Sequence, residues 1–229
     1  MDRDGLLRSL ATRVRDERVL DAMAAVPREL FVMPTMAAAA YEDAPLRIGH
    51  GQTISQPAIV ARMCELLELR PTDRVLDVGT GSGFHAAVLS RLCGHVWGVE
   101  LEQQLAMRAS RALTQADIDN VTVVAGDGSL GLPQHAPFDA INVAATAHGE
   151  VPPALEQQLA LGGRLVAPIV DDDGERLVPR TPPRGRLRAR PAGVRPLRAN
   201  ALMLICRDIS RACIRPPGYA QSSTWVGGP

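Results

Sequence analysis

Short apolar runs alternate with amphipathic stretches along most of this 229-residue chain. Five of the runs have the length and the branched apolar residues that are typical of buried strands. They lie at residues 75–78, 95–100, 121–128, 138–145 and 164–170. Strands that alternate with helices at this spacing form a parallel, doubly wound sheet with helices on both faces. We therefore predict a single α/β domain of this class.

Helical spacing accounts for the stretches before and between the strands. One or two amphipathic helices are expected within residues 3–26, where Pro27 ends them. Pro57 can occupy the first turn of a helix over residues 58–69. Further helices are expected at residues 85–92, 102–116 and 152–161. A turn at Gly162-Gly163 would then lead into the fifth strand.

A polar segment with two hydroxyl groups and two amides occupies residues 50–57, immediately before one of these helices. We expect a loop there. Ser55 and Gln56 could simply cap the helix that follows, because short polar side chains favour that position. A direct role of the segment in a binding site is the alternative, and composition alone leaves both open.

The strongest chemical signal is the stretch from Arg74 to Phe84, in which a buried strand ends in glycines 79, 81 and 83. Asp77 precedes these glycines, and Thr80 and Ser82 lie between them. A loop that binds a dinucleotide pyrophosphate has the spacing G-x-G-x-x-G, so the tighter spacing here disfavours a nucleotide dehydrogenase. A carboxylate beside the loop suits a ligand that is cationic and rich in hydroxyls, such as S-adenosylmethionine. A strand–turn–helix unit with spare glycines is the structural alternative.

Two later strands also end in acids, and parallel strands bring their carboxyl ends to one edge of the sheet. Glu100 lies 23 residues after Asp77, close to the offset of ~20 residues at which an acid meets ribose hydroxyls in such folds. Asp127 and Gly128 follow the third strand. A solvated acid at a strand end is the alternative interpretation of Glu100.

Composition excludes several classes of protein. Cys64 and Cys93 lie in apolar helical patterns, and no C-x-x-C pair is present, so we expect reduced core thiols in a cytoplasmic protein. No histidine pair has metal-ligand spacing, and we expect no metal site. No apolar run approaches the length of a membrane span and no secretory signal follows Met1, so no membrane association is expected.

Several segments together resemble the protein-L-isoaspartate O-methyltransferases, which are Rossmann-like, S-adenosylmethionine-dependent enzymes. The most specific is Gly51-Gln-Thr-Ile-Ser-Gln-Pro57, which is similar to the substrate loop of that family. The glycine stretch and Gly126-Asp127-Gly128 follow in the family's order. The resemblance covers roughly residues 15–178.

This resemblance implies a role for each matching residue. Asp77, with the loop residues Gly79, Thr80, Gly81, Ser82 and Gly83, would face the methionine part of the cofactor. Glu100 would hold the ribose hydroxyls, and Asp127 with Gly128 would flank the adenine. Thr53 and Ser55 would contact the substrate carboxylate, and Ser55 is the first choice for the catalytic residue.

The implied activity is methyl transfer from S-adenosylmethionine to the free carboxylate of L-isoaspartyl residues, which serves protein repair. The partners would be damaged proteins or peptides, with no metal, membrane or nucleic acid, and the chain would act as a monomer. Two alternatives stay open. One is a tailoring methyltransferase for a specific biosynthetic peptide, and the other is a cofactor-binding protein with impaired catalysis.

The last part of the chain departs from the resemblance. We expect one methyltransferase domain over residues 1–178, with helices and substrate loop in 1–57 and the cofactor-binding core in 58–178. Residues 179–229 hold ten arginines and one acid, many prolines, and a tail that we expect to be partly disordered. A binding segment for an acidic partner, a lineage-specific extension and a shifted reading frame are the three interpretations. Without closing strands, the fifth strand would present an exposed edge.

Overall fold

The computed structural model describes residues 1–145, 147–148, 150–171 and 174–180, and every structural statement below concerns these residues. The helices are α1 (Arg3–Ala11), α2 (Glu17–Ala25), α3 (Pro57–Leu67), α4 (Phe84–Ser90), α5 (Gln103–Gln115) and α6 (Pro153–Glu156). The strands are β1 (Leu46–Gly49), β2 (Gln52–Ile54), β3 (Arg74–Val78), β4 (His95–Glu100), β5 (Val121–Ala125), β6 (Phe138–Val143), β7 (Ala147–His148), β8 (Leu159–Asp171) and β9 (Gly174–Arg180). Short 3₁₀ helices are η1 (Arg28–Phe31), η2 (Pro34–Ala39), η3 (Gly128–Leu130) and η4 (Pro133–His135).

The main sheet has the strand order β5-β4-β3-β6-β8-β7, and β9 pairs with β8. All neighbours along this order are parallel, whereas β9 runs antiparallel to β8. The predicted doubly wound, mostly parallel sheet is therefore confirmed. The chain leaves β3 toward β4 on one side and returns to β6 on the other, so the switch point of the topology lies at the carboxyl end of β3. Ligands of open α/β sheets bind in the crevice at such a point.

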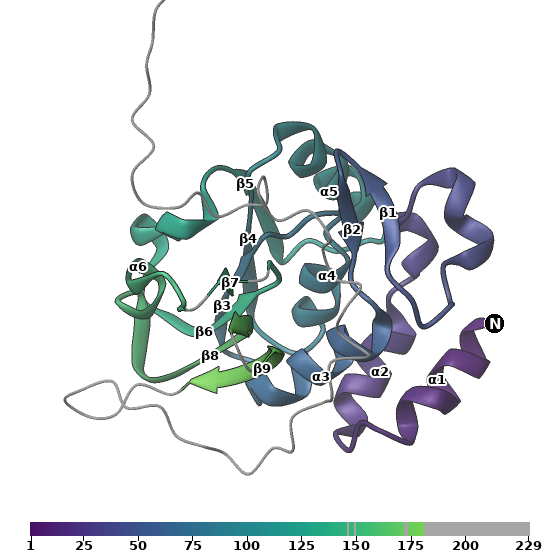
Figure 1. Ribbon diagram of the computed structural model, residues 1–229, viewed down its shortest axis with the longest axis horizontal. Helices are drawn as coiled ribbons and strands as arrows, with labels where there is room; N and C mark the ends of the chain where they lie inside the picture. The colour runs from purple at the N-terminus through teal and green to yellow at the C-terminus, as the bar shows by residue number, and fades with distance from the viewer. Residues whose placement is uncertain (146, 149, 172–173, 181–229) are drawn as a thin grey trace, which may run out of the picture.

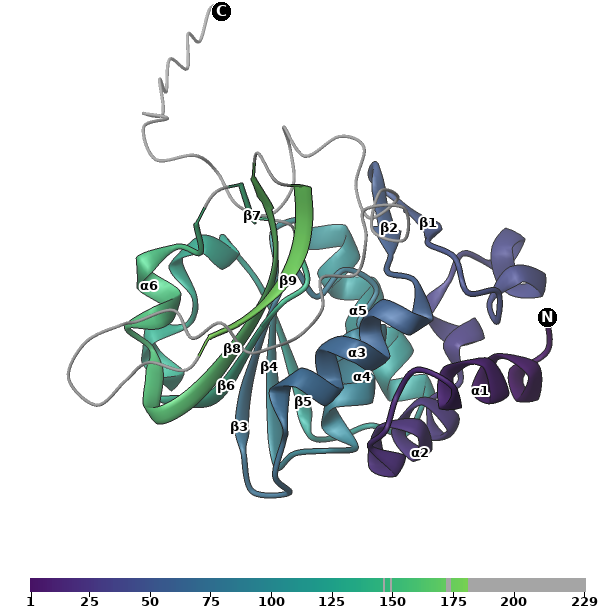
Figure 2. The same ribbon diagram turned by 60° about the horizontal axis from the view of Figure 1, so that its bottom comes forward.

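Helices cover both faces of this sheet, as Figures 1 and 2 show. In Figure 2, α3, α4 and α5 lie on one face and α6 lies on the other. The two N-terminal helices form an outer layer, in which α2 contacts both α3 and α4. The two helices were expected from the amphipathic pattern of residues 3–26, and their packing extends the core beyond the sheet.

Alternation along the strands divides the core in two, because successive side chains of a strand point to opposite faces. Val75 and Val96 join the larger cluster, which contains the N-terminal helices and α3 to α5. Leu76 and Trp97, their neighbours in sequence, join the cluster under α6. β3 and β4 are thus buried on both faces, which explains why they read as nearly continuous apolar runs.

The polar segment at residues 50–57 was predicted to be a loop. It instead contains the turn and the second strand of a β-hairpin formed by β1 and β2. β1 and β2 pair antiparallel, with Arg47 opposite Thr53, and the turn contains His50 and Gly51 at φ of +52° and +73°. The strands are only four and three residues long, too short to give a clear alternating pattern. Thr53 therefore lies within a strand, and Ser55 lies just after it.

The predicted helix at residues 152–161 is wrong in length. α6 ends at Glu156, and the chain already pairs with β6 at Leu159. The side-chain amide of Gln158 donates to the carbonyl oxygen of Leu130 at 2.8 Å and accepts from the Leu132 amide at 2.8 Å, which fixes the chain there in a non-helical path. The predicted turn at Gly162-Gly163 is also wrong: both glycines lie inside β8, where the register shifts as in a β-bulge.

The prediction that the fifth strand, β8, presents an exposed edge is also wrong. β8 pairs with β9 from Leu165, opposite Arg180, to Asp171, opposite Gly174. Pro179 lies in β9, opposite Val166, and β9 is the outer strand of this pair, where proline can be accommodated. The division of the chain at residue 178 stays a prediction, since the arginine-rich residues 181–229, with Cys206 and Cys213, lie outside the described residues.

The described residues also bear on the predictions about cysteines, metal sites and membrane helices. Cys64 and Cys93 are buried and form no disulfide. No group of three or more His, Cys, Asp or Glu side chains there is arranged to hold a metal ion. Within the same residues, no helix combines the length and the apolarity that a membrane crossing requires.

Candidate functional site

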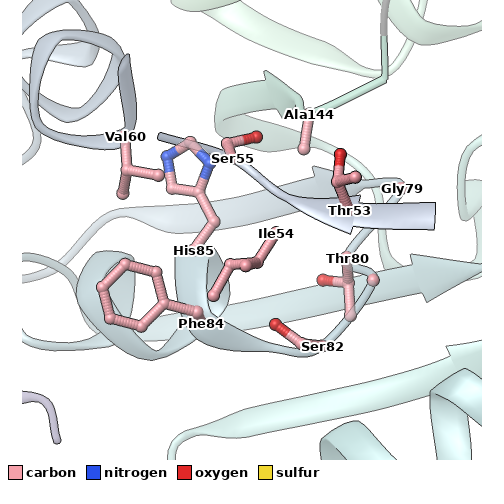
Figure 3. A pocket seen from close by; sticks show the side chains of 11 residues that line it. Thr53, Ile54, Ser55, Val60, Gly79, Thr80, Ser82, Phe84, His85 and Ala144 are labelled. Carbon is pink, nitrogen blue, oxygen red and sulfur yellow. The ribbon is translucent and has the colours of Figure 1, made fainter. Parts of the chain in front are cut away.

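An open cavity lies at the carboxyl end of β3, at the switch point of the sheet. The hairpin contributes Thr53 and Ser55 to its wall, and the loop after β3 contributes residues 79–82. Figure 3 shows Thr53 and Ser55 on one side of the cavity, with Thr80 and Ser82 across from them. The two sequence motifs that were predicted separately therefore face one cavity.

The glycines of this loop are required by its backbone path. Gly79, Gly81 and Gly83 have φ values of +77°, +57° and +88°, a region that L side chains rarely adopt. A Cβ at Gly79 would lie 3.1 Å from the Cβ of Ala145, and one at Gly83 would lie 3.1 Å from the Cβ of Ala109. The loop thus turns tightly from β3 into α4, and at Gly79 and Gly81 only backbone lies at the cavity wall.

Glu100 ends β4 and reaches the same loop from the neighbouring strand. Its side chain is buried, and its Oε2 accepts a hydrogen bond of 2.8 Å from the Gly81 amide. Its Oε1 accepts a second bond, of 3.0 Å, from the Glu102 amide at the start of α5. The acid that was predicted to meet ribose hydroxyls therefore also fixes the middle of the glycine loop.

Asp77 is fully buried beneath the loop and is held by two side chains. Its Oδ2 accepts a hydrogen bond from the Thr80 hydroxyl, and its Oδ1 accepts one of 2.6 Å from Nδ2 of Asn142. Burial raises the pKa of Asp77 to about 6, because the charged form is poorly solvated, and the two hydrogen bonds partly oppose this rise. A negative charge at this position gains stability from a nearby cation.

Asn142 connects Asp77 to His85, which also lines the cavity. Nδ2 of Asn142 lies 3.1 Å from Nδ1 of His85, and Nε2 of His85 lies 3.6 Å from Sγ of Cys64. The opposite amide orientation would place Oδ1 of Asn142 against the Asp77 carboxylate, so the network itself assigns Nδ2 to that side. Nδ1 of His85 consequently accepts, and the ring carries its hydrogen on Nε2.

Burial makes His85 a sensitive reporter of this network, because it lowers the pKa of the imidazole to about 3. The unfolded chain takes up a proton below pH 6.5, whereas the folded chain does not, so acidification destabilises the fold. We expect His85→Gln, which stays neutral, to escape this loss. Between pH 7.5 and pH 5 the wild type should lose about 2 kcal/mol of unfolding free energy relative to the variant.

Denaturant unfolding of both proteins at the two pH values measures this difference. The titration of Asp77 has the opposite sign, because its raised pKa favours the folded state as pH falls from about 6 toward 3.8. Asp77 is present in both proteins, so its contribution largely cancels in the comparison. Equal pH dependence of wild type and variant would contradict the buried, neutral state of His85.

The two remaining predicted residues lie further along the sheet edge. Asp127 and Gly128 follow β5, which pairs with β4 on the side away from β3. The Asp127 carboxylate caps η3, where its Oδ1 accepts from the amide of Ser129 at 2.9 Å and from its hydroxyl at 2.7 Å. Glu100 lies between this pair and the glycine loop, so the acids follow one another in the order β3, β4, β5.

Three residues that shape this site were not predicted from the sequence: His85, Asn142 and Arg28. Asn142 interrupts the apolar run of β6 and lies directly opposite Asp77 in the strand register, so a polar residue inside a buried strand was its signal. Arg28 is buried beside the hairpin, and its Nη2 donates to the Ser55 carbonyl oxygen at 2.9 Å. Its position near the end of the N-terminal helical segment gave no indication of this contact.

Comparison with known proteins identifies similar chains over most of this length. The family model described as "Protein-L-isoaspartate(D-aspartate) O-methyltransferase (PCMT)" matches residues 2–181. Proteins named protein-L-isoaspartate O-methyltransferase from Burkholderia mallei (strain SAVP1) and Burkholderia thailandensis are each 53% identical over 169 residues, or 73% of this chain. The matched region covers 52% and 51% of those proteins. The chain thus spans about half the length of the curated relatives it matches.

Solved structures show the same relationship. A protein-L-isoaspartate O-methyltransferase with 32% identity has a TM-score of 0.71, and the match covers 79% of this chain and 60% of the other. A second, described as a beta-aspartate methyltransferase from Plasmodium falciparum in complex with S-adenosyl-L-homocysteine, has 26% identity and a TM-score of 0.71. That match covers 88% of this chain and 99% of the other.

Proposed function

The chain belongs to the protein-L-isoaspartate(D-aspartate) O-methyltransferase family, and from that premise we propose that it methylates L-isoaspartyl residues with S-adenosylmethionine. The acceptor is the free carboxylate of such a residue in a damaged protein or peptide, and the purpose is repair. One observation carries the proposal: Thr53 and Ser55 share a cavity with the glycine loop that follows β3.

The residues around the cavity fit this cofactor. The glycine loop lets backbone approach a ligand closely, as a tightly held cofactor requires. Asp77 and Glu100 supply buried carboxylates, which suit a ligand with a positive charge and several hydroxyls. We propose that Asp77 and residues 79–83 hold the methionine part and that Glu100 holds the ribose. Asp127 and Gly128 would then meet the adenine at the next strand.

The chemistry needs little from the protein beyond positioning. When bound, S-adenosylmethionine supplies a methyl group on a positively charged sulfonium. The acceptor is the α-carboxylate of the isoaspartyl residue, with a pKa of about 3.3–3.7, so it is ionised at pH 7 and loses no proton as its oxygen forms the new bond. The chain therefore has to align the acceptor oxygen and exclude water from it, and positioning of this kind contributes on the order of 7–11 kcal/mol.

We assign that alignment to Ser55, with Thr53 as its neighbour on β2. A neutral hydroxyl donor orients a carboxylate oxygen without forming the ion pair that would weaken its attack. The carbonyl group of Ser55 is held by Arg28, so the residue has a fixed backbone from which its side chain can act. Thr53 and Ser55 line the same cavity as residues 79–82 of the glycine loop, which supports an acceptor site beside the cofactor.

A methyl-transfer assay with matched peptides tests the proposal. The purified chain is incubated with S-adenosylmethionine that carries a tritiated methyl group and with either an isoaspartyl peptide or its aspartyl twin. We expect labelling of the isoaspartyl peptide alone. Equal labelling of the twins would reject the substrate assignment, and labelling of neither would reject the activity.

We also propose a catalytic unit, a cellular compartment and an oligomeric state for this activity. We propose that residues 1–178 form the catalytic unit, which the family match over residues 2–181 supports. We place it in the cytoplasm as a monomer that acts on isoaspartyl proteins, without a metal or a nucleic acid. The two buried thiols of the described part, Cys64 and Cys93, are compatible with a reducing compartment.

A further inference from the structure

Arg28 is the largest polar side chain buried beside the hairpin, and it joins segments that are far apart in the sequence. It is 1% exposed. Its Nε donates to the carbonyl oxygen of Ala40 at 2.9 Å, and its Nη2 donates to that of Ser55 at 2.9 Å. Its guanidinium carbon lies 4.6 Å from the ring centroid of Phe84, the first residue of α4. One side chain thus contacts both the hairpin end and the end of the glycine loop.

The charge on Arg28 is retained in spite of its burial. Desolvation lowers the pKa of the guanidinium to about 9, while Asp43 and Tyr41 oppose that change, so the group is cationic at neutral pH. A buried cation is costly unless several partners satisfy it. Two carbonyl oxygens, an aromatic face and the charge of Asp43 offset part of this cost and fix the guanidinium in one place, while its Nη1 has no hydrogen-bond partner among the described residues.

Asp43 holds the chain at a second point, on the C-terminal side of Ser55. Its Oδ1 accepts a hydrogen bond of 2.9 Å from the Ala58 amide, in the first turn of α3. The chain from Ser55 to Ala58 is therefore held at two backbone atoms, the carbonyl oxygen of Ser55 and the amide of Ala58. Asp43 forms its ion pair with Arg13, whose Nη1 lies 3.0 Å from Oδ2 of Asp43, and its charge also favours the cationic form of Arg28.

We propose that Arg28 is a positioning residue for methyl transfer, which fixes the backbone of Ser55 against the end of the glycine loop through Phe84. This inference rests on the proposed function for its kinetic consequence, although the fixed backbone is a property of the fold itself. Phe84 and Ser55 both line the cavity, so a shift of the guanidinium changes the distance between the acceptor and cofactor sides. A misplacement of about 1 Å can reduce a rate by about 100-fold.

Arg28→Lys tests the inference, because an ammonium keeps the charge but cannot bridge two carbonyl oxygens in the geometry of a guanidinium. We expect faster hydrogen exchange over residues 52–56, measured by mass spectrometry. We also expect kcat/KM for an isoaspartyl peptide to fall by roughly 10- to 100-fold. The dissociation constant for S-adenosylmethionine, measured by calorimetry, should change by less than about threefold.

Arg18→Lys is the matched control, since Arg18 donates to the carbonyl oxygen of Leu69 at 3.1 Å on a surface away from the cavity. It should leave all three measurements unchanged. If Arg28→Lys fails to fold, Asp43→Asn replaces it, with Arg13→Gln measured beside it because Asp43→Asn also breaks the ion pair of Asp43 with Arg13. Asp43→Asn keeps an oxygen for the Ala58 amide and removes a charge that favours the cationic form of Arg28. It should change the three measurements in the same directions, by smaller factors.

Two results would overturn the inference. One is unchanged hydrogen exchange over residues 52–56 in the substituted protein. The other is an equal loss of peptide turnover and cofactor affinity, which indicates general damage to the fold. A wild-type protein that methylates no isoaspartyl peptide would contradict the proposed function instead, and hydrogen exchange would still decide whether Arg28 fixes Ser55.

Discussion

Ser55→Ala should reduce kcat/KM for an isoaspartyl peptide by about 100- to 1,000-fold, the size of effect seen when a positioned hydrogen-bond donor is removed from an active site. The substitution removes only the hydroxyl group. The carbonyl oxygen of Ser55 still accepts from Arg28, so the hairpin keeps its place. Steady-state kinetics with the methyl-transfer assay measure the loss, and calorimetry should show that the affinity for S-adenosylmethionine is nearly unchanged.

Ser110→Ala is the matched control for this experiment. The Ser110 hydroxyl donates to the carbonyl oxygen of Ala106 at 3.0 Å within α5 and lies outside the cavity. Its loss should leave turnover at the wild-type level. A fully active Ser55→Ala protein would remove Ser55 from its proposed role and leave Thr53 as the candidate.

Glu100→Ala should have the reverse effect and weaken cofactor binding far more than turnover. A hydrogen bond to a charged group contributes about 1.5–3 kcal/mol. The loss of two such bonds to ribose hydroxyls corresponds to a rise of about 100-fold or more in the dissociation constant. The variant also loses the acceptor for the Gly81 amide, which adds to the effect because the glycine loop is no longer held at its middle.

Calorimetry with S-adenosylmethionine or S-adenosylhomocysteine measures the change, and kcat at saturating cofactor should fall by less than about tenfold. Asp73→Asn provides the control, because Asp73 is a buried acid at the opposite end of β3, where it pairs with Arg164. That variant should lose stability while its cofactor affinity stays at the wild-type level. Unchanged affinity in Glu100→Ala would contradict the ribose assignment.

The parts of the fold that the sequence predicted are those with local signals. β4 was predicted at His95–Glu100 and lies at those residues, because its branched apolar residues and the following acid mark both ends. The tight turn after β3 was also predicted from local sequence, because glycine is the residue best suited to the three positive φ values within five residues. The location of the acids at one edge of the sheet was predicted because parallel strands have their carboxyl ends at the same edge.

The missed features depend on contacts between distant segments. The hairpin was read as a loop because its strands are short and its polar residues do not alternate with apolar ones. Asn142 and His85 are 57 residues apart, and only the fold makes them neighbours. Gly162-Gly163 was read as a turn on local grounds, although pairing with β6 at Leu159 and again from Arg164 keeps that segment in β8.

The hairpin is attached to its surroundings at several backbone atoms. Besides Arg28 and Asp43, Arg108 of α5 donates from its Nη1 to the Ile48 carbonyl oxygen at 2.6 Å. An incoming peptide therefore meets a segment whose conformational entropy is already lost. Fixing a flexible backbone costs about 1–2 kcal/mol per residue, and here that cost falls on folding rather than on complex formation. Under the proposed function, the ordering cost that remains on complex formation is that of the peptide itself.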